Sequence, residues 1–302
     1  MNLEGALRIG GTGRSKQQPI GFQGLARNAR CHAIVSPGGA RKVPRDWDPL
    51  YRLPMNLCTD ADLGYASQRT RFSSGQALLL DQQYRLAHLP LVAPSHPKII
   101  ASKAGTPYLM GLHDTVTSLV LPVPAALYDA PALLELVREL RTASFAPKIA
   151  WGILEARRSR LHATLCSSPA RDERFTALAQ LGKLRIELRG LFSGSLNHGR
   201  LYLKTYPERI GAENALVRIQ RALNARVTDL YPVGLFNLLD DLTVAETADL
   251  ARLIDRWWDQ PILRFDVDRL WLLSARDDLV LDAEIVDTIP LSTDRCGAPT
   301  PS

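Results

Sequence analysis

The residues best suited to chemistry lie in the segment 160–165, which reads Arg-Leu-His-Ala-Thr-Leu. Apolar residues flank His162 and Thr164, and this alternation is typical of a strand, in which residues i and i+2 share a face. The imidazole and the hydroxyl would then point the same way, with Ala163 and Leu165 packed behind them. Such a pair can transfer a proton and hold a phosphate oxygen. His162 and Thr164 are therefore the candidate catalytic residues.

Further polar side chains occur on or near neighbouring segments. Arg160 precedes His162, Arg200 and Lys204 fall in an alternating segment, and His198 lies in a predicted turn. Groups of this kind bind phosphate oxygens. Arg160, Arg200, Lys204 and His198 are therefore candidate substrate-binding residues. Solvated faces of alternating strands would carry the same side chains, and the sequence does not decide between the two interpretations.

The elements that must position these residues follow one another regularly from Ser118 onward. The pattern predicts strands at 118–122, around 162, at 184–189 and 200–204, at 233–239, and finally at 263–273 and 279–289. It predicts helices from Asp129, from Ser168-Pro169 to Gly182, over Leu216–Leu223, and from the capping box Thr243–Glu246. The hairpins among these strands favour an antiparallel α+β fold over a doubly wound parallel sheet.

Composition limits the class of protein. The chain has 302 residues, 46% of them hydrophobic, and no apolar run approaches the roughly 20 residues that span a bilayer. Its four cysteines show no C-x-x-C spacing, so we expect reduced thiols in a cytoplasmic protein, with no disulfide framework and no zinc site. No motif calls for a cofactor or a metal, and a monomer is expected.

The charge divides the chain unevenly. Of a net formal charge of +6, most lies in residues 1–50, which carry eight basic and three acidic side chains. We predict a basic, Gly-rich arm over residues 1–45, an unassigned region over 46–115, the α+β domain over 116–292, and a polar tail over 293–302. A basic arm can contact nucleic acid or serve as a transit segment, and it can equally be a solvated chain.

The order of elements and three motifs resemble the 2H phosphoesterase superfamily, which includes the bacterial RNA 2′,3′-cyclic phosphodiesterases, also known as 2′-5′ RNA ligases. The motifs are Leu161–Leu165, the hairpin from Phe192 to Leu203, and the closing segment from Phe265 to Leu291. The resemblance implies two pseudo-symmetric α+β lobes around a groove, each supplying one His-x-Thr/Ser motif. In such a site two histidines share the roles of acid and base, and no metal is required.

The sequence departs from the family pattern at the second motif. Alignment on Pro232 places Val233 where a histidine is expected and Leu235 where a threonine or serine is expected, and no histidine follows His198. The resemblance therefore implies a protein that acts on a nucleotide or RNA cyclic phosphodiester with His162 as its one retained acid or base. The alternatives are a degenerate member that binds a phosphorylated ligand, RNA or a protein without turnover, and a scaffold reused for different chemistry.

Overall fold

The computed structural model describes residues 56–169, 172–195 and 197–291. The chain divides into two units, residues 1–47 and 48–302, and all of the described residues belong to the second. The predicted basic arm (1–45) and polar tail (293–302) lie outside the described residues. Within the described ranges, no helix has the length and apolarity to cross a bilayer.

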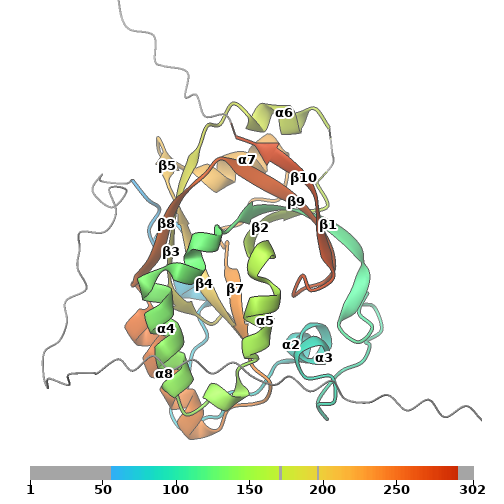
Figure 1. Ribbon diagram of the computed structural model, residues 1–302, viewed down its shortest axis with the longest axis vertical. Helices are drawn as coiled ribbons and strands as arrows, with labels where there is room; N and C mark the ends of the chain where they lie inside the picture. The colour runs from blue at the N-terminus through green and yellow to red at the C-terminus, as the bar shows by residue number, and fades with distance from the viewer. Residues whose placement is uncertain (1–55, 170–171, 196, 292–302) are drawn as a thin grey trace, which may run out of the picture. The chain divides into compact units, whose positions relative to one another are not determined.

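Eight strands form one antiparallel sheet that curls strongly (Figure 1). Their order is β10-β9-β1-β2-β7-β4-β3-β8, which places β2 and β7 at the centre. The strands are Leu112–Pro122 (β1), His162–Ser167 (β2), Leu184–Phe192 (β3), Arg200–Pro207 (β4), Val233–Asn237 (β7), Pro261–Val267 (β8), Arg269–Asp277 (β9) and Ala283–Pro290 (β10). Arg209–Ile210 (β5) and Glu213–Asn214 (β6) form a separate pair. The α+β class with an antiparallel sheet is confirmed.

The α-helices lie between these strands and in the segment that precedes β1. They are Tyr65–Gln68 (α1), Gln82–Ala87 (α2), Leu89–Val92 (α3), Pro131–Thr142 (α4), Trp151–Ala156 (α5), Arg174–Leu178 (α6), Ala215–Ala222 (α7) and Val244–Trp257 (α8). Short 3₁₀ helices span Ala125–Asp129, Ala146–Lys148 and Arg158–Arg160. In Figure 1, α4 and α8 lie side by side, and hydrogen bonds from Arg256 and Trp257 to Glu139 join them.

Helix α8 forms as the sequence predicts. Thr243 caps its first turn, and the Thr243 and Glu246 side chains each accept a backbone N–H of the other residue, which is the expected capping box. The apolar stripe of the helix, with Leu250, Ile254 and Trp257, is buried against the core. The end of α8 approaches β3 at Gly190, where a Cβ atom would overlap the carbonyl oxygen of Trp257. The close approach of helix and strand therefore requires glycine at this position.

Other predicted boundaries were wrong. The helix expected from Ser168-Pro169 is only α6, because Ser168 has a φ of 48° and does not cap it. Asp129 closes a 3₁₀ helix, and α4 begins beyond it at Pro131 without a side-chain cap. The strand expected over 263–273 is two strands, β8 and β9, which separate at Asp268.

The region before β1 shares its core with the sheet. Leu63, Tyr65, Leu78 and Tyr84 belong to the same buried apolar cluster as the core residues of the sheet. The Tyr65 hydroxyl donates to the carbonyl of Thr205 at 3.3 Å and accepts the Thr205 N–H at 2.9 Å, so it bonds directly to β4. The sequence left the region 46–115 unassigned. Its described part is joined to the sheet by apolar packing and by hydrogen bonds to the backbone of β4.

The contact at Gly190 can be tested by substitution. Gly190→Ala is expected to lower the free energy of unfolding by about 3 kcal/mol, because α8 must move away from β3 to admit the methyl group. Gly152→Ala in α5 is the matched control, since no atom outside its own helix backbone and its chain neighbours lies within 4 Å of the added Cβ there. Urea denaturation measures both variants, and a loss below about 1 kcal/mol for Gly190→Ala would contradict the packing described.

Candidate functional site

His162 opens the central strand β2. The strand alternates as expected: His162 is half-buried and Thr164 exposed on one face, while Ala163 and Leu165 are buried on the other. The ring nitrogen Nδ1 lies 2.7 Å from the carbonyl oxygen of Arg160. Because a carbonyl only accepts, Nδ1 carries the proton, and Nε2 of the neutral ring is left with a free lone pair.

The surroundings of His162 favour this neutral form. Burial, together with the charges of Arg157 and Arg200, lowers the pKa of His162 to about 4, against the opposing effect of the hydrogen bond to the Arg160 carbonyl. At neutral pH the imidazole is therefore uncharged and can accept a proton or a hydrogen bond at Nε2.

Two arginines act on this imidazole through their charge, and both reach Gly234 of β7. Arg157, which follows α5, is 1% exposed, and its Nη1 donates to the carbonyl oxygen of Gly234 at 2.9 Å. Arg200, at the start of β4, donates from Nη1 to the Nε2 of His88 at 3.1 Å and to the carbonyl of Asp278 at 3.3 Å. Burial, followed by the charge of Arg200, lowers the pKa of Arg157 to about 9, so Arg157 remains charged at neutral pH.

Neither arginine forms an ion pair with a carboxylate among the described residues, and the Nε atoms of both are buried without an acceptor there. We call Arg157, Arg200, His88 and His162 the cationic cluster. A buried guanidinium group normally has an anionic partner, because its desolvation is costly. The two groups are held here by backbone carbonyls and a histidine instead.

Gly234 makes room for this cluster on the central strand β7. Ala163 pairs with Val233, so the antiparallel register places Gly234 opposite His162 and on the same face. A Cβ at Gly234 would overlap the guanidinium of Arg200. Val233 and Leu235, assigned to the second motif by the sequence, are fully buried and face the core instead. The residue that faces His162 across the strand pair is therefore a glycine.

His88 completes the cluster from the end of α2. Its ring stacks on that of Tyr84 with centroids 5.2 Å apart and planes 4° from parallel. The residue is 1% exposed, and burial, with the charges of Arg200 and Arg157, holds the pKa of His88 well below its usual range. The ring is neutral and accepts a hydrogen bond from Arg200, because a guanidinium only donates.

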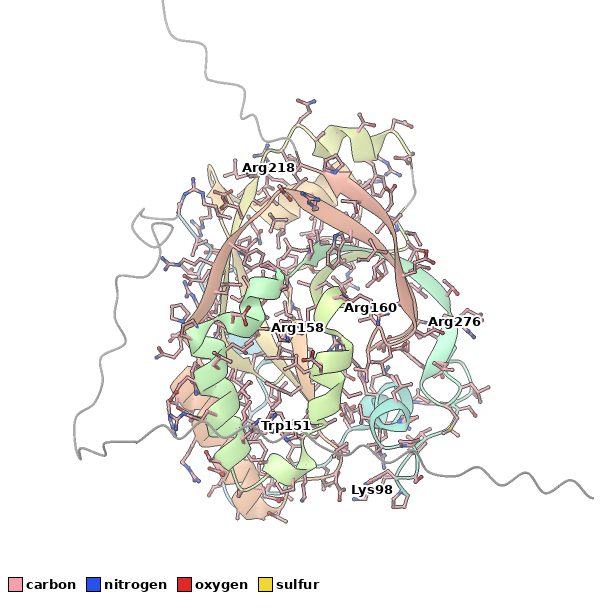
Figure 2. All side chains as sticks on the ribbon, viewed as in Figure 1. Lys98, Trp151, Arg158, Arg160, Arg218 and Arg276 are labelled. Carbon is pink, nitrogen blue, oxygen red and sulfur yellow. The ribbon has the colours of Figure 1, made fainter. Side chains whose placement is uncertain are left out.

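The β9–β10 turn lies beside the cationic cluster and accepts hydrogen bonds from Arg160. The guanidinium of Arg160 donates to the carbonyls of Ala283 at 2.7 Å and Leu281 at 3.4 Å. Figure 2 shows Arg160 between the end of α5 and this hairpin. Arg160 thus holds the turn with its side chain and orients His162 with its backbone carbonyl. The sequence predicted Arg160 as a substrate contact, and the structure shows it in this positioning role.

The remaining predicted site residues lie elsewhere. The Lys204 side chain is 0% exposed, with Nζ 3.6 Å from the centre of the Trp258 ring and 4.0 Å from Asp60, and burial lowers the pKa of Lys204 to about 8. The backbone N–H of His198 donates to Asp81, and in the described part of the chain no hydrogen bond or ion pair joins the His198 ring to the cationic cluster. The structure brings together His162 and Arg200, with Thr164 exposed on the same face.

Sequence reasoning missed three residues of this site: Arg157, His88 and Gly234. Arg157 lies five residues before His162, and the run Arg157-Arg158-Ser159-Arg160 is the one local signal that could have drawn attention to it. His88 has no partner at a recognisable spacing, because its contacts are with Tyr84 on its own helix and with Arg200, 112 residues away.

His113 lies near the cluster but bonds outside it. Its Nε2 is 3.4 Å from a carboxylate oxygen of Asp278, whose other oxygen accepts the Tyr108 hydroxyl at 2.8 Å. The backbone carbonyl of Asp278 is the group that accepts from Arg200. The short segment 113–115 therefore contributes a third histidine to the neighbourhood, joined to Arg200 through Asp278.

The comparisons with known proteins do not identify the chain. No family model matches it, and none of the curated proteins compared with it is a match. Across the described residues, no group of three or more histidine, cysteine or acidic side chains could hold a metal ion. The chemistry available to the cationic cluster comes from two guanidinium charges, one buried and one half-buried, and from the neutral imidazole of His162 with its free Nε2, a combination that suits an anion that can exchange a proton.

The depressed pKa of His162 has a measurable consequence for stability. The unfolded chain binds a proton at His162 below about pH 6.5, while the folded chain binds it only near pH 4, so acid favours unfolding over this interval. From pH 7 to pH 5 this residue is expected to remove about 2 kcal/mol from the free energy of unfolding. His162→Asn keeps a donor for the Arg160 carbonyl but does not titrate.

Urea denaturation of wild type and His162→Asn at pH 7, 6 and 5 measures this effect. The stability of the variant is expected to fall less than that of wild type as the pH is lowered, because His88 titrates in both proteins and His162 only in one. Parallel loss of stability in the two proteins would show that His162 is solvated and not held neutral by its surroundings.

Proposed function

We propose that the protein binds a phosphate ester of a nucleotide or RNA at the cationic cluster, and that His162 exchanges a proton with a bound cyclic phosphodiester. The observation that carries this proposal is the pair of guanidinium groups at Gly234, with Arg157 fully buried and Arg200 half-buried, each with a buried, unused Nε–H and without a carboxylate partner in the described residues. Guanidinium groups bind phosphate oxygens through two parallel hydrogen bonds, and burial strengthens such a pair.

The topology also supports a 2H-type arrangement. The central four strands follow the order β1-β2-β7-β4, and each inner strand is separated along the chain from its outer neighbour by a helical segment: α4 and α5 between β1 and β2, and α7 between β4 and β7. We infer a pseudo-two-fold relation between these halves, with His162 on one side of it and Gly234 on the other. The strand order thus favours the proposal that the protein resembles the 2H phosphoesterases.

The proposed reaction is hydrolysis of a cyclic phosphodiester. Water attacks phosphorus, Nε2 of His162 takes a proton from that water, and the bond from phosphorus to one ribose oxygen breaks. The departing oxygen takes its proton from solvent, because the position across from His162 is Gly234 and His88 is occupied by Arg200. Arg157 and Arg200 would stabilise the charge that develops on the non-bridging oxygens. His162 then releases its proton to solvent.

Binding without turnover is the second candidate, and one observation favours it. A base with a pKa near 4 is weak, and His162 lacks a facing partner that could serve as general acid. In that case the cationic cluster holds a phosphorylated ligand, and His162 contributes a hydrogen-bond acceptor to it.

Hydrolysis of nucleoside 2′,3′-cyclic phosphates and of short RNA ending in a cyclic phosphate separates the two candidates. If the protein is an enzyme, His162→Ala is expected to lower kcat by about 10²–10⁴-fold, the range for loss of one general acid or base. Arg200→Lys is expected to raise KM and lower kcat together, because lysine keeps the charge but loses the planar pair of donors.

Two matched variants serve as controls. His96→Ala removes a histidine whose ring faces Asp240 at 3.2 Å, and Arg218→Lys alters an arginine of α7 labelled in Figure 2. Neither is expected to change turnover. Hydrolysis that survives His162→Ala at the wild-type rate would exclude His162 as the base. Absence of turnover in a folded protein that still binds phosphate esters would leave the binding candidate.

A further inference from the structure

We propose that the cationic cluster is matched in charge to a dianionic phosphate monoester, so that a 2′- or 3′-phosphate end binds more tightly than the cyclic diester from which it forms. This inference rests on the proposed function, because it places the phosphate at the same residues. It assigns the class of the tightest ligand, which the proposed reaction leaves open.

The cationic cluster carries two positive charges at neutral pH. Arg157 and Arg200 are charged at neutral pH, and the remaining members of the cluster, His88 and His162, are neutral. Arg157 is backed by a backbone carbonyl, and Arg200 by a carbonyl and a neutral ring. These partners orient the guanidinium groups without cancelling their charge.

Asp277 at the end of β9 and Asp278 after it lie near the cluster, and their carboxylates are engaged by other groups. The buried Asp277 carboxylate accepts three backbone N–H groups of its own turn, from Leu279 at 2.8 Å, Leu281 at 3.1 Å and Asp282 at 2.7 Å. It acts on Arg157 only at a distance, as a weak influence that raises the pKa of Arg157. The Asp278 carboxylate faces Tyr108 and His113. Among the described residues, neither forms an ion pair with Arg157 or Arg200.

The two esters differ in how far they neutralise these charges. A phosphate monoester carries nearly two negative charges at pH 7.5, because its second pKa is about 6, whereas a diester carries one. The monoester also presents three terminal oxygens to the unused Nε–H donors of Arg157 and Arg200, and the diester presents two. At neutral pH the monoester therefore neutralises the cluster, and the diester leaves one positive charge uncompensated.

Methyl phosphate and dimethyl phosphate test this difference on the full chain. They share the phosphate chemistry, they lack a base or ribose, and the proposed reaction does not consume them. Titration followed by ³¹P NMR at pH 7.5 is expected to show methyl phosphate binding about tenfold or more tightly than dimethyl phosphate. At pH 5 the ratio is expected to shrink to within about threefold, because methyl phosphate is then a monoanion.

Variants locate the effect. Arg200→Gln removes one of the two charges and is expected to abolish the preference at pH 7.5, while Arg218→Gln, on the surface helix α7, keeps it. Arg200 is half-buried and tolerates change better than Arg157, and Arg200→Lys keeps the charge and is expected to keep part of the preference.

The outcomes separate this inference from the proposed function. Dimethyl phosphate that binds as tightly as methyl phosphate, in a manner that depends on Arg200, would overturn the inference and leave the phosphate site in place. Binding of neither ester, or binding insensitive to Arg200→Gln, would overturn both. A preference for methyl phosphate that Arg200→Gln removes supports both.

Discussion

The site depends on two guanidinium groups, that of Arg157 fully buried and that of Arg200 half-buried, which lack a carboxylate partner in the described part of the chain. Moving a charged group out of water costs several kcal/mol even after relaxation, and a second like charge beside it adds to that cost. The fold meets this cost with carbonyl oxygens of β7 and of the β9–β10 turn, and with a histidine held neutral by its own burial. An anion that binds only the folded state would recover part of this cost as stability.

The sheet order brings these groups together. β2, β7 and β4 are consecutive in the sheet although β3 and α7 intervene along the chain, so His162, Gly234 and Arg200 become neighbours across three strands. Arg157 arrives from the end of α5, which contacts β7 (Figure 1). The absence of a side chain at Gly234 then decides what lies opposite His162, because any larger residue would displace Arg200.

Local patterns predicted much of the fold but little of the site. The capping box of α8 and the alternation in β2 depend on neighbours in sequence, and both are confirmed, whereas the alternation expected in β3 fails at Glu187, which is fully buried. The register between β2 and β7 depends on residues 70 apart, and an alignment on Pro232 therefore assigned Val233 to the face of His162 when it belongs to the core.

Burial of charge was the other feature that the sequence could not reveal. Arginine is rarely fully buried, so Arg157 resembles any surface residue in a basic run until α5 and β7 enclose it. Lys204 shows the converse. Its place in an alternating strand suggested a solvent or ligand face, yet the strand presents it to Trp258 and Asp60 beneath the segment that precedes β1.

The central claim is that His162 is a neutral imidazole placed to meet an anion between two arginines. ¹⁵N NMR of the histidine rings at pH 7, recorded with and without inorganic phosphate, tests it most directly. Without phosphate, Nε2 of His162 is expected to show the shift of an unprotonated nitrogen, and phosphate is expected to move it toward the protonated value. An imidazole already protonated before addition, or one that phosphate leaves unchanged while its neighbours respond, would contradict the account.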